Sequence, residues 1–226
     1  MSKLKNSKCL KIIIDSLMFI IMLLEFSKVF TGQFVHELLG IIFLVLFILH
    51  NLININFYKK LFKGKYNNTR ILMTIVNIGL LLFITLTILL GIPISKKIFV
   101  FFHIDSGMLI SKLHILFSYY SLIFMAMHLG LHYKVIFKNI IGKTKNNKVL
   151  KYTLLITELI IIILGINSSI DINLLNYILG KSTFGLKTEN IILSIYNTLL
   201  VVLMISVIVY NMEILLLRYN KGKKEL

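Results

Sequence analysis

Four histidines form two pairs with the same spacing. His36 and His50 lie fourteen residues apart in one apolar stretch, and His114 and His128 lie fourteen residues apart in another. Fourteen residues of α-helix advance about 21 Å and fall only about 40° short of four full turns, so both imidazoles of a pair project from one face. Two such helices, parallel and side by side, would bring the four imidazoles together as two facing pairs. Two imidazoles saturate a haem iron, which then exchanges electrons without binding oxygen.

This spacing predicts two b-type haems, one held by His36 and His114 and the other by His50 and His128. His132 follows His128 by one helical turn on the same face, so either residue could ligate the second haem. We favour His128 because its spacing repeats that of the other pair, and we assign His132 to a propionate contact or to the interfacial end of the site. The chain has no C-x-x-C-H motif, so a thioether-linked haem is excluded.

The elements that must position these residues are membrane-spanning helices. Apolar residues make up 58% of the 226 residues and the mean hydropathy is +0.89, which excludes an ordinary soluble domain. The fold class that we predict is all-α integral membrane, a six-transmembrane-helix bundle with a four-helix cytochrome b-like core. The predicted spans are Leu10–Phe30, Phe34–Phe57, Ile71–Ile92, Leu109–Leu131, Leu150–Ile166 and Ile191–Leu217.

The basic residues predict the orientation. With a cytoplasmic N-terminus, 19 of the 25 lysines and arginines fall on the inner side and six on the outer side. This distribution satisfies the positive-inside rule, so we expect a multi-pass protein of the cytoplasmic membrane with both termini in the cytoplasm. The net charge of +16 then reflects topology and attraction to anionic membrane lipid, and no nucleic acid is expected as a partner.

The connections between the spans are short and leave no room for a nucleotide-binding domain. We divide the chain into a four-helix diheme domain (residues 1–138) and two additional helices with a basic tail (residues 139–226). The redox partner must therefore be another polypeptide or a quinone. The outer loops hold His103, which we expect at the membrane interface, and the stretch Asp171–Leu175, which we expect to form a short turn of helix.

Several other polar residues need an explanation inside a membrane, where ionisable groups are costly. They are Asp15, Glu25, Glu158 and Glu213. Asp15 lies level with the inner histidines, where it could hydrogen-bond a ligand imidazole or relay a proton, or could simply reach the interface. Glu37 is expected to be solvated. Gly40 and Gly130 could let a macrocycle approach the backbone, or could simply reflect the frequency of glycine in membrane helices.

Several stretches around the histidines resemble the flavinylation-associated cytochrome family, within the broader diheme b-type cytochrome group. They are Thr31–Gly40, His50–Asn54, Lys112–His114 and His128–Tyr133, and the likeness runs from Lys11 to Lys138. The resemblance implies a small b-type cytochrome with His36, His50, His114 and His128 as haem ligands. It also implies electron transfer from the quinone pool or a cytoplasmic donor to an extracytosolic flavin-bearing protein. Tyr133 stands where family members often have tryptophan, and the final two helices lie outside the likeness.

Two other function classes remain open. The same histidines, with Asp15, Glu25 or Glu158, could serve a divalent-metal transporter or a metal-binding membrane protein, although only His128 and His132 offer the close pair that such sites often use. The bundle could also be a non-redox membrane anchor or assembly subunit. The leading hypothesis is an electron-transfer subunit of an oxidoreductase system, which is not a stand-alone catalyst.

Overall fold

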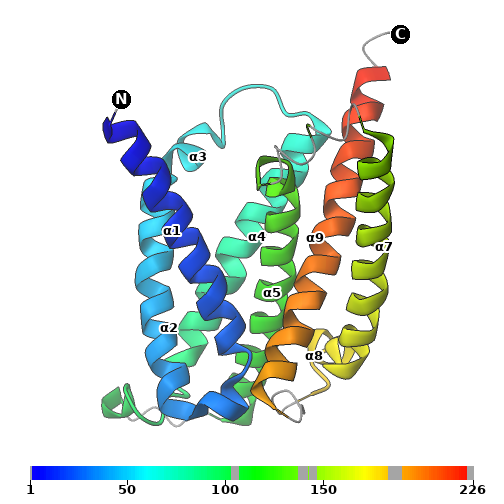
Figure 1. The fold of residues 1–226 in the computed structure, drawn as a ribbon. Helices are drawn as coiled ribbons and strands as arrows, with labels where there is room; N and C mark the ends of the chain where they lie inside the picture. Colours follow the sequence, from blue (N-terminus) through cyan, green and yellow to red (C-terminus); the bar gives the residue numbers. More distant parts are fainter. Residues whose placement is uncertain (1, 103–106, 137–141, 143–146, 183–189, 223–226) are drawn as a thin grey trace.

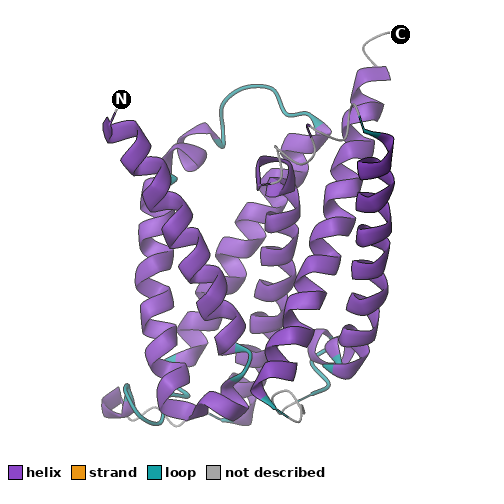
Figure 2. Cartoon of the chain, viewed as in Figure 1, coloured by secondary structure: helices purple, strands orange, loops and turns teal. Residues whose placement is uncertain are grey.

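The regular structure of the chain is entirely helical where it is described. The computed structural model describes residues 2–102, 107–136, 142, 147–182 and 190–222, and contains no strand within these ranges (Figure 2). The elements are α1 (Ser2–Glu25), α2 (Lys28–Ile53), α3 (Ile55–Lys60), α4 (Asn68–Gly91), the 3-10 turn η1 (Val100–Phe102), α5 (Met108–Ile136), α7 (Lys148–Asp171), α8 (Leu174–Ile178) and α9 (Ile191–Gly222). A short helix lies close to the one expected at Asp171–Leu175, but it begins at Leu174 and runs to Ile178, because α7 extends to Asp171. His103 lies outside the described residues.

The long helices run the height of one bundle (Figure 1). We call the end that carries α3 and the start of α1 the inner end, and the end that carries the α1–α2 junction, η1 and α8 the outer end. From the outer end, α2 and α5 run in the same direction (Figure 1). The two helices that carry the paired histidines are therefore parallel, as the sequence predicted.

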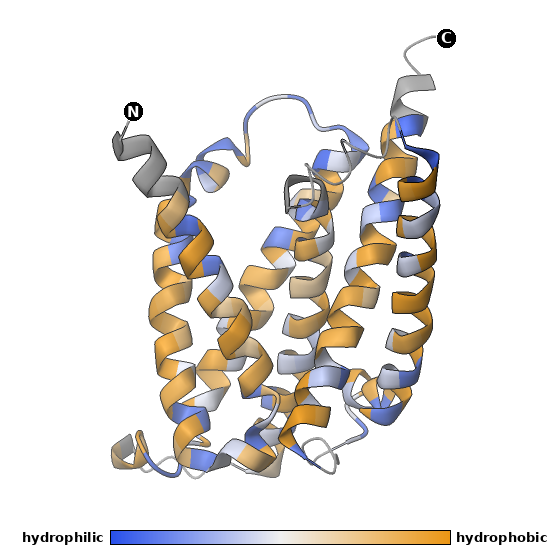
Figure 3. Ribbon diagram, viewed as in Figure 1, coloured by the Kyte–Doolittle hydropathy of each residue, from blue (hydrophilic) through white to orange (hydrophobic). Residues whose placement is uncertain are grey.

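Among the described residues, five helices are long and apolar enough to cross a membrane: α2, α4, α5, α7 and α9. Their apolar residues cover the sides of the bundle, whereas polar residues gather towards its ends (Figure 3). The chain is therefore an all-α membrane protein. α1, the expected first span, is 24 residues long but is not among the five, because Lys8, Lys11, Asp15 and Glu25 interrupt its apolar run.

Local signals explain where the helices begin and bend. The Asn67 side chain accepts a hydrogen bond from the Arg70 backbone amide (2.8 Å) and caps α4, and Asn147 caps α7 in the same way. α2 is interrupted only at Gly32, whose φ of +80° suits glycine and few other residues. Since this interruption precedes His36, the helix between His36 and His50 is regular.

The helices pack as neighbouring pairs: α1 with α2, α4 with α5, α5 with α9, and α7 with α9. Glycines permit the closest of these approaches, since a Cβ at Gly130 of α5 would meet the Ser206 carbonyl oxygen of α9 at 2.5 Å, and one at Gly165 of α7 would collide with Met204 of α9. The α2 backbone, by contrast, stays apart from α4 and α5, with at most isolated close approaches. α2 also has no fully buried residue.

The α1–α2 pair is attached to the other helices near its outer end. There, the Phe26 ring meets the Tyr119 ring edge-on, with centroids 5.2 Å apart, and the Ser27 hydroxyl donates to the Ser194 hydroxyl (3.2 Å). Tyr119 and Leu122 of α5 are buried there with Val201 and other residues of α9. Because α9 packs directly on α5, the helices beyond residue 138 belong to the same bundle core as the histidine helices.

Candidate functional site

The outer histidines of the two pairs face each other across the space between α2 and α5. The ring centroids of His36 and His114 lie 6.2 Å apart and the rings are almost perpendicular (84°). An imidazole nitrogen lies about 2 Å from a metal ion that it ligates, so two imidazoles on opposite sides of one iron have centroids about 6 Å apart. The pairing expected from the sequence is therefore found at a separation that one iron could bridge.

Both outer imidazoles have an oxygen atom close to the ring nitrogen Nδ1, and for His114 this contact is a hydrogen bond. His114 Nδ1 lies 2.9 Å from the Thr87 carbonyl oxygen, and His36 Nδ1 lies 2.5 Å from Glu25 Oε2. A carbonyl oxygen can only accept, so Nδ1 of His114 carries the hydrogen and the lone pair is left on Nε2. Metal-ligating histidines are typically oriented in this way by a carbonyl or a carboxylate.

The inner histidines have corresponding partners. His50 Nδ1 lies 2.7 Å from Asp15 Oδ1, and His128 Nδ1 lies 2.7 Å from Asn77 Oδ1. The His132 ring lies against that of His128, with centroids 4.6 Å apart. Charge interactions also link Asp15 and His50 with His128 and His132, so these residues share one region of the bundle.

The inner histidines, His50 and His128, are less favourably arranged to bind one metal ion together than the outer pair is. Asn54 Nδ2 lies 3.4 Å from His50 Nε2 and also donates to the His50 carbonyl oxygen (2.9 Å). Lys11 in turn donates to Asn54 Oδ1 (3.0 Å). For His50 to bind a metal through Nε2, the Asn54 amide has to turn away. The contacts favour His128 over His132 as the ligand of an inner haem, because Asn77 orients the His128 ring.

Two glycines that the sequence analysis treated alike differ in their surroundings. A Cβ placed on Gly40, one turn after His36, would have no neighbour within 4 Å. A Cβ on Gly130, two residues after His128, would strike the α9 backbone at Ser206. Gly40 thus leaves open space beside the outer histidine, whereas the macrocycle interpretation of Gly130 is wrong, because this glycine allows α5 and α9 to touch.

Glu37, which the sequence analysis expected to be solvated, lies only partly buried at the surface and is also held by protein groups. Its carboxylate accepts hydrogen bonds from the Ser95 hydroxyl (2.7 Å) and from the Lys96 and Ile98 backbone amides (2.8 and 2.7 Å). Gln33 and the Lys97 amide donate to it as well. Glu37 therefore fastens the segment after α4 to α2, one residue from His36. Loop amides give no sequence signal, so this role could not be found from the pattern.

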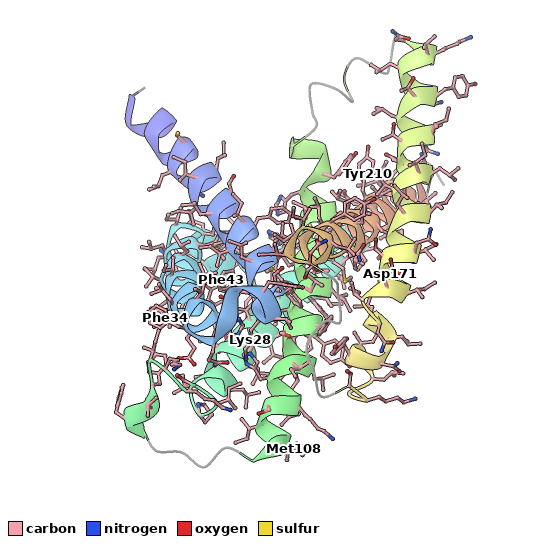
Figure 4. The ribbon with its side chains drawn as sticks, turned by 60° about the horizontal axis from the view of Figure 1, so that its bottom comes forward. Lys28, Phe34, Phe43, Met108, Asp171 and Tyr210 are labelled. Atoms are coloured by element: carbon pink, nitrogen blue, oxygen red, sulfur yellow. The ribbon has the colours of Figure 1, made fainter. Side chains whose placement is uncertain are left out.

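Figure 4 shows the bundle tilted so that its outer end comes forward. Lys28 lies between the α1–α2 pair and α5, whereas Phe34 lies on the far side of α2. Lys28 interacts electrostatically with Glu25, Glu37 and His114. The space between α2 and α5 thus has a cationic group at its outer end.

The remaining polar candidates lie away from the facing pair. Glu158 of α7 accepts from the Asn211 amide of α9 (3.2 Å), and Glu213 is buried with its Oε2 lacking a hydrogen-bond partner among the described residues. Tyr119 stacks on Tyr177 (4.3 Å between centroids), and the Tyr120 hydroxyl donates to an α8 carbonyl. These two tyrosines therefore tie α5 to α8.

Within the described parts of the chain, no three histidine, cysteine, aspartate or glutamate side chains are gathered as the ligands of one metal ion. Comparison of the sequence and structure with protein-family models, curated proteins and solved structures gave no match. The interpretation of the site therefore depends on its geometry.

Sequence reasoning missed two residues of α4 that contact the histidines, Asn77 and Thr87. Asn77 was the more visible of the two in the sequence, because it is an amide within an apolar run.

Proposed function

We propose that this chain is a b-type cytochrome that carries electrons across a membrane through two haems, each held between one histidine of α2 and one of α5. The observation that carries the proposal is the facing pair of His36 and His114, placed 6.2 Å apart on helices whose backbones stay separated, with an oxygen of Glu25 and of Thr87 beside the respective Nδ1 atoms. This arrangement leaves Nε2 of His114 available to iron.

The second haem in this proposal is held by His50 and His128, about 21 Å further along the regular helix, with His132 beside it. A bound haem supplies reversible one-electron exchange. The chain's own residues orient the imidazoles and would fix how far apart the two haems lie.

The proposal extends to topology and partners. α1 would cross the membrane as a sixth span, with its charged groups facing α2, and the basic inner end would lie in the cytoplasm under the positive-inside rule. Electrons would enter from a quinone or a cytoplasmic donor and leave at the outer end to an extracytosolic acceptor such as a flavin-bearing protein. The protein would then be the membrane subunit of an oxidoreductase system.

The test is a visible spectrum of the purified chain, reduced minus oxidised, with the amount of haem per chain. The wild type is expected to bind two b-type haems. His36→Ala should lose the outer haem and His50→Ala the inner one, so each variant should retain one. His132→Ala is the matched control and should retain both, whereas loss of the inner haem in this variant would make His132 its ligand.

A wild-type chain that binds no haem when haem is supplied during expression would refute the proposal. Measurement of bound divalent metal would then test the main alternative, a metal-binding or metal-transporting membrane protein.

A further inference from the structure

The partners of the four histidines differ in charge according to the helix that supplies them. α1 provides carboxylates, Glu25 to His36 and Asp15 to His50. α4 provides neutral oxygens instead, the Thr87 carbonyl to His114 and the Asn77 amide to His128. In each proposed haem site, one histidine ligand would therefore contact a negatively charged carboxylate and the other would contact a neutral oxygen.

A carboxylate within an apolar bundle is costly unless a positive charge lies nearby. The Glu25 side chain is only 18% exposed, and its Oε1 atom is buried without a hydrogen-bond partner among the described residues. His36 would be neutral as an iron ligand and could offer Glu25 only a dipole. Lys28 interacts with Glu25 electrostatically, but the described residues show no ion pair between the two within 4 Å.

A ferric haem with two neutral imidazole ligands carries a positive charge at the iron that the ferrous haem lacks. A carboxylate behind one imidazole attracts this charge and increases the electron density that the ligand donates, so it stabilises the ferric form. The effect weakens where water screens the carboxylate. Asp15 is 53% exposed and Glu25 only 18%, so the outer haem should experience the stronger effect.

We infer that Glu25 and Asp15 of α1 set the reduction potentials of the two haems, and that the buried Glu25 lowers the potential of the outer haem more than Asp15 lowers that of the inner haem. This inference rests on the proposed function. It makes α1 a positioning and charge-compensating helix, which binds no cofactor itself. The couple concerned is one-electron Fe(III)/Fe(II), with the electron supplied by the donor.

The experiment is a redox titration of the purified holoprotein, followed by absorbance and by the low-spin EPR signals of the two haems. Glu25→Gln keeps the shape and removes the charge, and should shift the reduction equilibrium of one haem at least tenfold towards the ferrous form, which is 59 mV for a one-electron couple. Asp15→Asn should shift the other haem in the same direction by less. Glu158→Gln, a carboxylate between α7 and α9, is the control and should shift neither.

Glu25→Asp retains the charge, and should leave both potentials closer to the wild type than Glu25→Gln does. If Glu25→Gln binds two haems with unchanged reduction potentials, the inference is overturned and the cytochrome proposal stands. The same holds if Asp15→Asn shifts a reduction potential by more than Glu25→Gln does. If Glu25→Gln binds no outer haem, the test is Asp15→Asn. An unchanged reduction potential of the inner haem in Asp15→Asn would then overturn the inference. A wild type without haem refutes the proposed function itself.

Discussion

Replacing Gly130 or Gly40 by alanine separates two glycines that look equivalent in the sequence. At Gly130 the new Cβ would lie 2.5 Å from the Ser206 carbonyl oxygen and 3.1 Å from the Ser206 Cα, both backbone atoms of α9. Ordinary contacts begin at 3.4 Å, so α5 and α9 would have to part by roughly 1 Å. Overpacking of this kind costs about 1–3 kcal/mol. At Gly40 the same atom meets nothing within 4 Å.

Both substitutions gain the same helix propensity, up to about 1 kcal/mol, so this gain cancels when the two variants are compared. We therefore expect Gly130→Ala to be less stable than Gly40→Ala by about 1–3 kcal/mol. For a chain of this size, 1 kcal/mol corresponds to about 2–4 °C in melting temperature. The assay is thermal unfolding of both variants in one detergent without added haem. A Gly130→Ala variant that melts at or above Gly40→Ala would refute the packing argument.

Three further substitutions have defined outcomes. Glu37→Ala removes a charged hydrogen-bond acceptor, and each bond to it contributes about 1.5–3 kcal/mol. Hydrogen exchange of the backbone amides at residues 96–98 should therefore accelerate at least tenfold, whereas exchange of the α9 amides, the control, should not change. Asn77→Leu removes the hydrogen-bond acceptor for His128 Nδ1 and should weaken haem binding at the inner site about 10–100-fold. The measurement is a haem titration of the apoprotein, and an affinity equal to that of the wild type would contradict the proposed role of Asn77. Ser206→Ala loses a hydroxyl shared between two carbonyls and should cost about 0.6 kcal/mol in the same thermal assay, and a melting temperature at or above that of the wild type would contradict this role.

The sequence was sufficient to predict the relation between the two histidine helices. Fourteen-residue spacing fixes the face and the depth of each imidazole through helix geometry alone, and alternating spans make α2 and α5 parallel. His36 and His114 accordingly face each other. The all-helical membrane class followed from composition, whereas six spans remain a prediction because the charges in α1 break its apolar run.

The features that escaped prediction depend on contacts between helices or between a helix and a loop. The Glu25–His36 pair joins α1 to α2, and no spacing within one helix encodes it. Glu37 looked solvated because the backbone amides that bind it have no side-chain signature. Gly130 has the same residue type as Gly40, and only the neighbouring α9 distinguishes them.

The packing of α9 has a consequence for biosynthesis. α9 contacts α1, α4, α5 and α7, yet it follows all of them in chain order. Translation proceeds from the N-terminus, so the earlier helices enter the membrane before the surface that joins them exists. Glu158 then lacks its Asn211 partner, and α5 and α7, which show no extended packing on each other along their described residues, are joined through α8 at the outer end but not along their length. The bundle must therefore form by rearrangement of inserted helices within the bilayer once α9 has been made.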